Sequence, residues 1–361
     1  MEAHPALHLS PRQKKTTMKT YHDQSLLTYN TFGIDAKCSR LVVYENESDA
    51  VALAIELGKK TDVPFLILGK GSNVLFTNDF KGTVVCSAIG GIRLIQNNAT
   101  DGENAPEKVV VKCGSGVEWD EFVSHCVSNG WHGIENLSFI PGTVGAAAVQ
   151  NIGAYGEEVC RYVREIRAVE TGTGRVVTIK AEDCAYGYRQ SRFKNEWKNR
   201  YLIIDVSFCL SRQFVPNTAY KDISAWLKDG RVTATELRNA VIDIRKKKLP
   251  DPEVMGNAGS FFMNPVVSSD KYEQICTAYD DVPHYRLDDG SVKIPAAWLI
   301  DKCGWKGKRL GRAGVYARQP LILVNCGGAD GHEIAALAHA VIADVKARFG
   351  IVLTPEVNII P

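Results

Sequence analysis

The sequence lacks the common signatures of metal sites, membrane spans and secretory leaders. Its ten cysteines include no Cys-x-x-Cys pair, and its eight histidines include no His-Glu-x-x-His arrangement. No apolar run approaches the roughly 18 residues of a membrane span, and the first residues contain no apolar leader segment. A formal net charge of +2 predicts no polyanionic partner from overall charge. We therefore expect no metal, no membrane insertion and no nucleic acid.

Cysteine usage and composition are typical of an intracellular enzyme of several domains. Cysteines scattered in this way are usually small buried hydrophobes in a reducing cytosol, so we expect a cytoplasmic protein. With 361 residues the chain exceeds what one core serves, and two or three domains are expected. Residues 1–25 are rich in His, Pro, Lys and Thr, and we expect a disordered extension there, with Met18 as an alternative start.

Hydrophobic spacing predicts alternating helices and strands through most of the chain. Ser48 is expected to cap the first helix, which ends at Gly58. Further expected helices are Trp119–Val127, Thr235–Leu249, Trp298–Asp301 and Ile334–Val345. Expected strands are Phe65–Leu68, Val109–Cys113, Leu202–Leu210, Leu321–Asn325 and Ile351–Ile360, with a hairpin of Val163–Val169 and Arg175–Lys180.

A glycine-rich loop, Gly69-Lys-Gly-Ser-Asn73, follows the strand that ends at Leu68. A strand, a glycine turn and polar backbone donors suit a phosphate cradle. The loop is nevertheless neither a Walker motif nor a complete Gly-x-Gly-x-x-Gly, because Lys70 precedes Gly71 and Val74 replaces the third glycine. From the residues alone, a phosphate cradle and a plain turn both remain open.

The segment Gly256-Asn-Ala-Gly-Ser-Phe-Phe-Met-Asn264 sets a single hydroxyl, Ser260, between a glycine and two aromatic residues. This pattern predicts backbone held close to a ligand and a hydroxyl screened from bulk water, suited to a proton donor or a nucleophile. An esterase elbow is excluded because position 262 is Phe rather than Gly. The alternative is a tight turn in which Ser260 caps the next segment.

Several charged residues invite both a structural and a functional interpretation. Arg189 in Gly187-Tyr-Arg-Gln-Ser191 either reaches water from a strand end or faces a site. The run Arg245-Lys-Lys-Lys248 is either a solvated helix end favoured by the helix dipole or an anion site. Glu356 stands among apolar residues, where a carboxylate is costly unless it is paired or reaches water.

Five motifs in one order link these segments to a known family. They are Ile140-Pro-Gly-Thr-Val-Gly145, Gln150-Asn-Ile-Gly-Ala-Tyr-Gly156, Gly187–Ser191, Lys248-Leu-Pro-Asp-Pro252 and Thr354-Pro-Glu356, with the serine segment between the last two. In this order the set resembles the UDP-N-acetylenolpyruvoylglucosamine reductases of the longer, type I form. The resemblance covers about residues 28 to 360, nearly the whole chain.

The resemblance implies an α+β protein with the FAD-binding fold of the vanillyl-alcohol oxidase type. That fold comprises two α/β subdomains, joined here to a separate α/β substrate-binding domain. The expected parts are 1–25 as extension, 26–90 and 91–215 as FAD-binding subdomains, 216–350 as substrate domain with a tyrosine-bearing loop, and 351–361 as a C-terminal strand with a catalytic Glu.

The resemblance also implies the site residues. It assigns catalysis to Ser260, Arg189 and Glu356 around one pocket. It implies FAD contacts from Asn30, Thr31, Gly69, Gly71, Ser72, Asn73, Pro141, Gly142, Thr143, Gly145, Ile152 and Gly153. It implies nucleotide-sugar contacts from Tyr155, Tyr220, Arg245, Lys248, Asn264 and Gln319.

The implied reaction has two stages and serves peptidoglycan synthesis for the cell wall. NADPH reduces FAD and leaves, and UDP-N-acetylglucosamine enolpyruvate then takes its place and accepts hydride at its terminal methylene carbon. Arg189 and Glu356 would stabilise the charge that builds next to the carboxylate. Ser260 would deliver a proton to the α-carbon, giving UDP-N-acetylmuramate.

Two other function classes remain open at this point. One is another oxidoreductase of the same flavin fold, such as an alcohol or sugar oxidase, and the other is a non-catalytic nucleotide-sugar sensor. Such oxidases often fix flavin through His or Cys, and neither occurs between Gly142 and Gly156, so we expect non-covalent FAD. A sensor should have lost Ser260, Arg189 or Glu356, and all three are present. A monomer is expected, because nothing in the sequence demands a partner.

Overall fold

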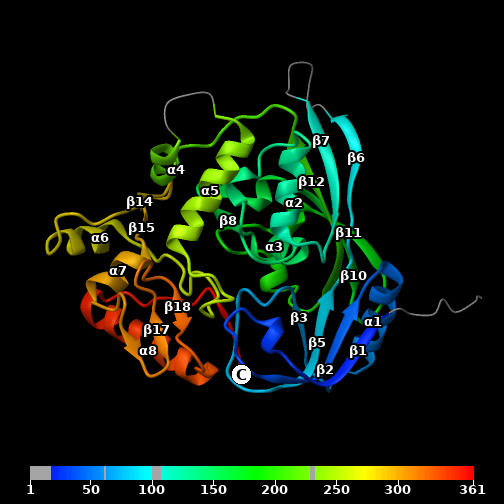
Figure 1. The fold of residues 1–361 in the computed structure, drawn as a ribbon, viewed down its shortest axis with the longest axis horizontal. Coiled ribbons are helices and arrows are strands. Elements are labelled where there is room, and N and C mark those ends of the chain that lie inside the picture. The colour runs from blue at the N-terminus through cyan, green and yellow to red at the C-terminus, as the bar shows by residue number, and fades with distance from the viewer. Residues whose placement is uncertain (1–17, 61, 100–106, 228–231) are drawn as a thin grey trace, which may run out of the picture.

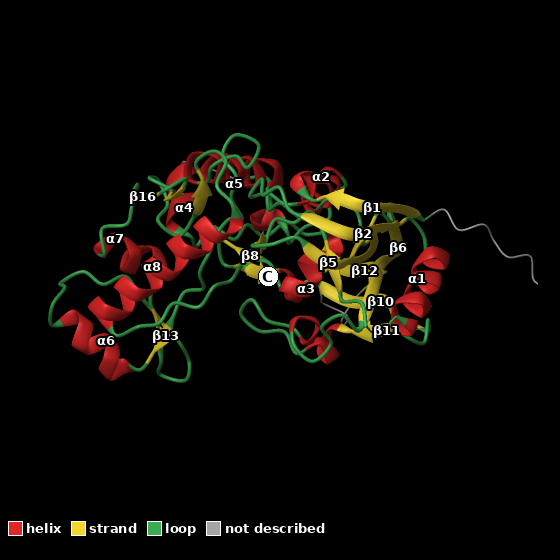
Figure 2. Ribbon diagram, turned by 90° about the horizontal axis from the view of Figure 1, so that it is seen from below, coloured by secondary structure: helices red, strands yellow, loops and turns green. Residues whose placement is uncertain are grey.

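Two sheets and a helical C-terminal part make up the computed structural model, which describes residues 18–60, 62–99, 107–227 and 232–361. The two large sheets lie on one side of the molecule, with α6, α7 and α8 on the other (Figure 1). A view turned by 90° shows the same separation of strands from C-terminal helices (Figure 2). The α+β class expected from the sequence is therefore confirmed.

The strands form two large sheets and four small ones. The first sheet has the order β1 (Lys19–Ser25), β2 (Lys37–Tyr44), β5 (Phe80–Ser87), β3 (Phe65–Leu68), and only the β1–β2 pair is antiparallel. The second is antiparallel throughout, with the order β11 (Val176–Lys180), β10 (Val163–Glu170), β12 (Tyr201–Ser211), β7 (Lys108–Gly114), β6 (Ile92–Ala99). Two of the small sheets have three strands each: β13 (Val266–Val267), β15 (Val292–Lys293) and β14 (Tyr285–Arg286) form one, and β16 (Arg309–Leu310), β17 (Ala313–Val315) and β18 (Leu323–Asn325) form the other. The remaining two have two strands each: β19 (Asn358–Ile360) runs parallel to β4 (Val74–Phe76), and β8 (Gly153–Ala154) pairs with β9 (Glu157–Glu158).

Eight α-helices join or cover these sheets in the described part of the chain. They are α1 (Glu47–Lys59), α2 (Trp119–Ser128), α3 (Val144–Gln150), α4 (Lys221–Trp226), α5 (Ala234–Lys248), α6 (Ser269–Cys276), α7 (Ala296–Lys302) and α8 (Gly331–Phe349). Capping boxes close the N-termini of the two longest helices: Thr233 with Glu236 at α5, and Asp330 with Glu333 at α8. Strong local signals of this kind explain why both helices are predictable from sequence.

Three expectations about local structure are wrong. The first helix is capped by Asn46 rather than Ser48. The Asn46 side chain accepts a hydrogen bond from the Asp49 N–H at 2.9 Å. The expected extension is ordered from Lys19, because β1 pairs with β2; residues 1–17 lie outside the described residues. The closing strand is limited to β19, since the chain before it runs beside the serine segment, with an isolated bridge between Phe262 and Pro355.

Strand β12 lies in the middle of the second sheet and is buried along most of its length. Helices cover both faces of this strand. Leu202 and Ile204 belong to the apolar cluster that includes α1, whereas Ile203 belongs to the cluster that includes α2 and α3. A strand between two helical layers has no solvent face, so small residues such as Ser207 are buried as well.

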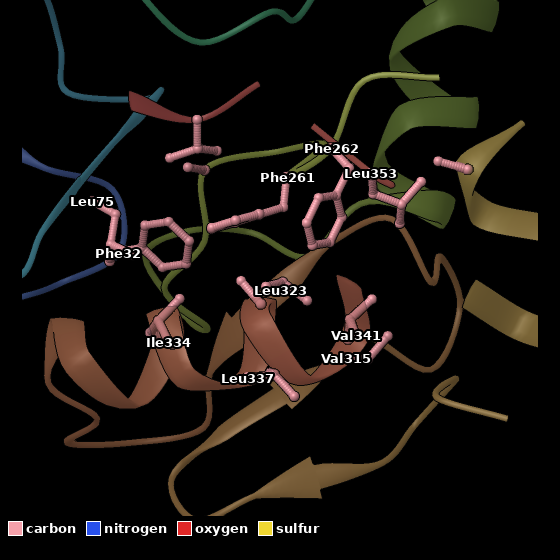
Figure 3. Packing of buried hydrophobic residues seen from close by; sticks show 14 of the residues in the cluster. Phe32, Leu75, Phe261, Phe262, Val315, Leu323, Ile334, Leu337, Val341 and Leu353 are labelled. Atoms are coloured by element: carbon pink, nitrogen blue, oxygen red, sulfur yellow. The ribbon is translucent and has the colours of Figure 1, made fainter. Parts of the chain in front are cut away.

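One apolar cluster joins the N-terminal segments to the C-terminal part. Phe32 and Leu75 pack together with Phe261, Ile334 and Leu337 of the last third of the chain (Figure 3). Phe261 is fully buried, and its ring contacts that of Phe32 edge to face at a centroid distance of 6.3 Å. The residue that follows Ser260 is thereby fixed in a core shared by both ends of the molecule.

Replacing Phe261 with Ala should lower the free energy of unfolding by about 3–5 kcal/mol, the range for truncating a buried aromatic side chain. Urea unfolding followed by circular dichroism measures this loss. The matched control is Val254→Ala, because Val254 is 84% exposed; a change within about 0.5 kcal/mol is expected there. Similar losses in the two variants would contradict the packing described here.

Candidate active site

Two adjoining cavities lie between the first sheet, helix α3 and the serine segment. The first has a volume of about 200 Å³ and the second about 180 Å³. They share a wall formed by Ser72, Asn73, Thr143, Ala146 and Gln150. Two compartments with a common wall fit an elongated ligand better than a compact one.

The glycine loop lies on the first cavity and packs against α3. A Cβ on Gly69 would come within 3.1 Å of the Thr143 hydroxyl, and a Cβ on Gly71 would lie 1.9 Å from the Tyr29 carbonyl oxygen. Gly71 also has φ +65°, a left-handed conformation that disfavours other residues. Both glycines therefore stand where the loop packs closely against Tyr29 and Thr143.

Most of the residues expected to bind FAD line one cavity or both. Ser72, Asn73 and Thr143 line both. Gly69, Gly71 and Gly145 line the first only, while Pro141, Gly142, Ile152 and Gly153 line the second only. In the described structure, Asn30 and Thr31 lie outside both linings. The Asn30 amide donates to the carbonyls of Leu26 and Ile34 at 2.8 and 2.9 Å, so this side chain stabilises its own turn.

The second cavity brings Arg189, Glu356 and Ser260 together. Arg189 Nε lies 3.1 Å from Glu356 Oε1, and its terminal nitrogens donate to the carbonyls of Asn151 and Gly153. A Cβ on Gly153 would lie 2.7 Å from Arg189 Nη1, so this glycine leaves room for the guanidinium. Arg189 has φ +55°, and strained backbone in a non-glycine residue is concentrated at functional sites.

The environment of Glu356 raises the pKa of its carboxyl above that of an exposed glutamate. The side chain is 16% exposed, and burial raises the pKa of its carboxyl above the ordinary value. The charges of Arg189 and Lys194 oppose that shift. Burial in turn lowers the pKa of Lys194, whose ammonium donates to the Arg189 carbonyl oxygen at 2.8 Å. The three groups form one electrostatically linked set at the cavity wall.

Backbone hydrogen bonds place Glu356 beside the serine segment. The Glu356 N–H donates to the Phe261 carbonyl at 2.8 Å, and the Met263 N–H donates to the Thr354 carbonyl at 2.9 Å. Asn73 of the glycine loop also donates to the Glu356 carbonyl at 3.3 Å and to Gln150 Oε1 at 2.8 Å. Residues far apart in the sequence thus meet through main-chain contacts.

Ser260 is exposed to the cavity, and the expected screening by its aromatic neighbours is wrong. Phe261 and Phe262 point into the apolar core, where they anchor the backbone (Figure 3). Gly259 has φ +69°, and its N–H donates to Asn257 Oδ1 at 3.0 Å. Within the described part of the chain, the Ser260 hydroxyl makes no hydrogen bond, so it is not the cap of the next segment. Its hydroxyl is available to a ligand.

The tyrosine-bearing segment contains a short helix, α4. The rings of Tyr220 and Tyr155 meet edge to face, with centroids 5.1 Å apart. Lys248 at the end of α5 forms an ion pair with Asp222 of α4. Arg245, one turn earlier on α5, lines the second cavity and donates to the Phe139 carbonyl at 3.0 Å.

Some expected nucleotide-sugar contacts lie outside the cavity linings in the described structure: Tyr155, Tyr220, Lys248, Asn264 and Gln319. Asn264 donates to the Tyr188 hydroxyl at 3.5 Å and accepts from the Ala296 N–H at 2.9 Å. Gln319 Oε1 accepts from the Leu321 N–H at 3.3 Å. The structure thus gives these two side chains local roles, and their ligand contacts stay predictions.

Sequence reasoning missed part of the first cavity. Its lining includes Tyr44, Ser115, Lys194, Trp197 and Tyr201. Tyr44 and Tyr201 come from strands, Ser115 from the turn after β7, and Lys194 and Trp197 from the segment before β12, with no motif or periodic spacing to mark them. Gln150 opened one of the motifs, yet no role was assigned to it.

No cluster of His, Cys, Asp and Glu suited to a metal ion is found among the residues that the structure describes. All ten cysteines are free, and Cys113 and Cys126 are buried. Over the same residues, no helix is long and apolar enough to cross a membrane.

Comparison with known families defines the class of protein. A model described as an FAD binding domain matches residues 39–180. A model described as the C-terminal domain of UDP-N-acetylenolpyruvoylglucosamine reductase matches residues 251–360. Together with the glycine-lined cavities, these matches define an FAD-dependent oxidoreductase.

Relatives at full length identify the family. A UDP-N-acetylenolpyruvoylglucosamine reductase of Bacteroides fragilis strain ATCC 25285 is 46% identical over 93% of this chain and 98% of its own length. One from Paraburkholderia phymatum is 43% identical over 92% of this chain and 96% of its own. The crystal structure of the Thermus caldophilus enzyme superposes with a TM-score of 0.65 at 20% identity, covering 96% of this chain and all of that one. The chain belongs to the UDP-N-acetylenolpyruvoylglucosamine reductase family, and its cofactor is FAD.

Replacing Gly71 with Ala should deprive the purified protein of most of its FAD. The new Cβ would collide with the Tyr29 carbonyl, and the left-handed backbone would be strained by about 1–2 kcal/mol. The ratio of flavin to protein absorbance measures retention. Gly90→Ala is the matched control, because a Cβ there meets open space. Equal flavin content in both variants would contradict a cofactor role for the loop.

Proposed function

We propose that this protein reduces the enolpyruvyl group of UDP-N-acetylglucosamine enolpyruvate to the lactyl ether, with NADPH as reductant, and so forms UDP-N-acetylmuramate. The observation that carries the proposal is the meeting of Arg189, Glu356 and Ser260 at one cavity that adjoins the glycine loop. The product serves peptidoglycan synthesis, and we place the reaction in the cytoplasm. Both substrates are small molecules, and we propose a monomer.

The two cavities suit FAD in shape and chemistry. Their common wall gives an elongated site, and the loop that contains Gly69 and Gly71 lines it with backbone N–H groups suited to a pyrophosphate. Among the described residues, neither cavity is lined by His or Cys, so the flavin is held without a covalent bond. When bound, FAD supplies the hydride that NADPH has given to it.

Arg189 binds the substrate carboxylate. The two terminal nitrogens each donate one N–H to the carbonyls of Asn151 and Gly153, and Nε forms an ion pair with Glu356, which fixes the plane of the fork. The remaining N–H groups can hold the carboxylate and the enolate oxygen that develops during reduction. A fixed fork needs no reorientation when this charge forms.

Glu356 assists Arg189 with the charge that develops on the substrate. Burial raises the pKa of its carboxyl above the ordinary value, which makes the carboxyl a suitable partner for sharing a proton with the developing aci-carboxylate. The adjacent positive charge of Arg189 opposes this rise in the pKa of the carboxyl. Arg189 and Glu356 together stabilise the charged intermediate of the substrate.

Ser260 donates the proton that sets the lactyl stereocentre. Its hydroxyl faces the cavity with Arg189 and Glu356, and its backbone is held by Gly259 and by Phe261 in the core. A serine hydroxyl is a weak acid in water, so it serves only against a strongly basic carbon in a site from which water has been displaced. Substrate itself must complete the screening that the aromatic residues do not provide.

The two half-reactions isolate the role of Ser260. Ser260→Ala should leave flavin reduction by NADPH nearly unchanged and slow the oxidation of reduced flavin by enolpyruvyl substrate by about a hundredfold or more. Stopped-flow absorbance follows both steps. Arg189→Lys should also impair the second step, because an ammonium cannot reproduce the fork. If Ser260→Ala slowed both steps equally, Ser260 would be a structural turn residue and the proposed role would be lost.

Lys248 is proposed to bind the diphosphate that NADPH and the UDP-sugar have in common. Lys248→Ala should therefore raise KM for both, since one site serves them in turn. The ion pair with Asp222 supplies a sharp control, because Asp222→Asn also breaks the contact between α4 and α5 but keeps the ammonium. Steady-state kinetics of the two variants decides the question. Equal rises in KM would show that Lys248 only holds α4 in place.

A further inference from the structure

Asn136 lies outside both cavities and outside every assigned site, yet it links two segments of the proposed substrate site. The residue belongs to a short 3₁₀ turn, Glu135–Leu137, and is 2% exposed. Its amide Nδ2 donates to the carbonyl of Tyr155 and to the carbonyl of Asn217, each at 2.9 Å. One amide proton thus holds the segment of Tyr155, and the other holds the segment that runs from Asn217 to Tyr220.

A second connection runs through Glu157, which is 8% exposed. Its Oε1 accepts a hydrogen bond from Asn217 Nδ2 at 2.5 Å, and its Oε2 accepts from the Tyr162 hydroxyl at 2.9 Å and from Arg161 Nη1 at 3.0 Å. Because both carboxylate oxygens are engaged, the carboxylate has a fixed orientation. Asn217 is therefore held through its main chain by Asn136 and through its side chain by Glu157.

These contacts fix the positions of Tyr155 and Tyr220, one of which has an unfavourable backbone conformation and the other an exposed side chain. Tyr155 has φ +50°, a conformation that a non-glycine residue keeps only when its surroundings enforce it. Tyr220 is 38% exposed and lies three residues after Asn217, at the N-terminus of α4. The edge-to-face contact of the two rings depends on the relative position of the two segments.

We infer that Asn136 and Glu157 are positioning residues that hold Tyr155 and Tyr220 in the geometry that binds the nucleotide sugar. The inference rests on the proposed function, because it takes the tyrosine pair to contact that ligand. Ordering two aromatic side chains at binding would cost affinity, and a pair that is ordered beforehand avoids this cost. Neither residue touches the reacting atoms.

The first test is Asn136→Ala. Loss of both donors leaves the Tyr155 and Asn217 carbonyls without their partner, and KM for the UDP-sugar should rise by about tenfold. The rate at saturation and the FAD content should stay close to those of the unaltered enzyme. An unchanged KM would overturn the inference.

A mutant cycle separates positioning from general destabilisation. In the background Tyr155→Ala with Tyr220→Ala, adding Asn136→Ala should raise KM no further, because the residues through which it acts are gone. The same multiplicative rise in both backgrounds would overturn the inference.

Asn217→Ala is a less disruptive variant for the same test. It removes the hydrogen bond to Glu157 from a half-buried segment and keeps the main-chain contact with Asn136. It should raise KM in the same sense, and no rise in a folded protein would count against the inference.

Asn325→Ala is the matched control for loss of a buried amide. Asn325 is 8% exposed and joins two segments by donating to the carbonyls of Phe32 and Ala329 at 3.0 and 3.3 Å. It should lower stability without changing KM for the UDP-sugar, and a KM rise equal to that of Asn136→Ala would overturn the inference.

Equilibrium binding keeps the inference distinct from the proposed reaction. If the unaltered protein failed to oxidise NADPH with the enolpyruvyl substrate, the proposed function would fall by itself. Calorimetric titration with UDP-N-acetylglucosamine would still report on the tyrosine pair, and Asn136→Ala should weaken that binding by about tenfold. Equal affinity in both proteins would overturn the positioning role whatever the outcome of the activity assay.

Discussion

A short run of main-chain hydrogen bonds between Phe261–Met263 and Thr354–Glu356 is the constraint on which the site depends. It sets Glu356 beside Ser260 without using either side chain, so both remain available to a ligand. The buried Phe261 and Phe262 keep this contact in register from the core side. The Asn73 side chain donates a hydrogen bond to the Glu356 carbonyl and so connects the glycine loop to these two segments. The glycine loop and Glu356 are therefore held in one frame.

Electrostatics in this frame is finely balanced. Burial favours the neutral form of Glu356, and the charges of Arg189 and Lys194 favour the ionised form. Lys194 itself is less basic than an exposed lysine because it is buried. Titratable groups with shifted pKa values are concentrated at functional sites, and this set lies where the reaction builds and then removes a charge. Arg189 is held on three sides, so the geometry of the set does not relax when the charge changes.

The sequence predicted what depends on local pattern or on a motif, and it failed where packing decides. The apolar stripes of α5 and α8 made both helices predictable, whereas the residues around Gly71 fitted a plain turn as well as a phosphate cradle. The orientation of Phe261 could not be predicted, because a core formed by both ends of the chain determines it. Lys194 carries no local signal of its role. Strand β1 was missed because its polar residues pair at a sheet edge, where no apolar period is needed.

The common wall of the two cavities has a consequence for the recognition of inhibitors. Ser72, Asn73, Thr143, Ala146 and Gln150 each face both compartments, so a ligand in one compartment would form part of the surface of the other. Under the proposed function, the compartment next to Ser260 would therefore reach its final shape only when FAD is bound. Compounds selected against flavin-free protein would therefore be fitted to a surface that the working enzyme does not present.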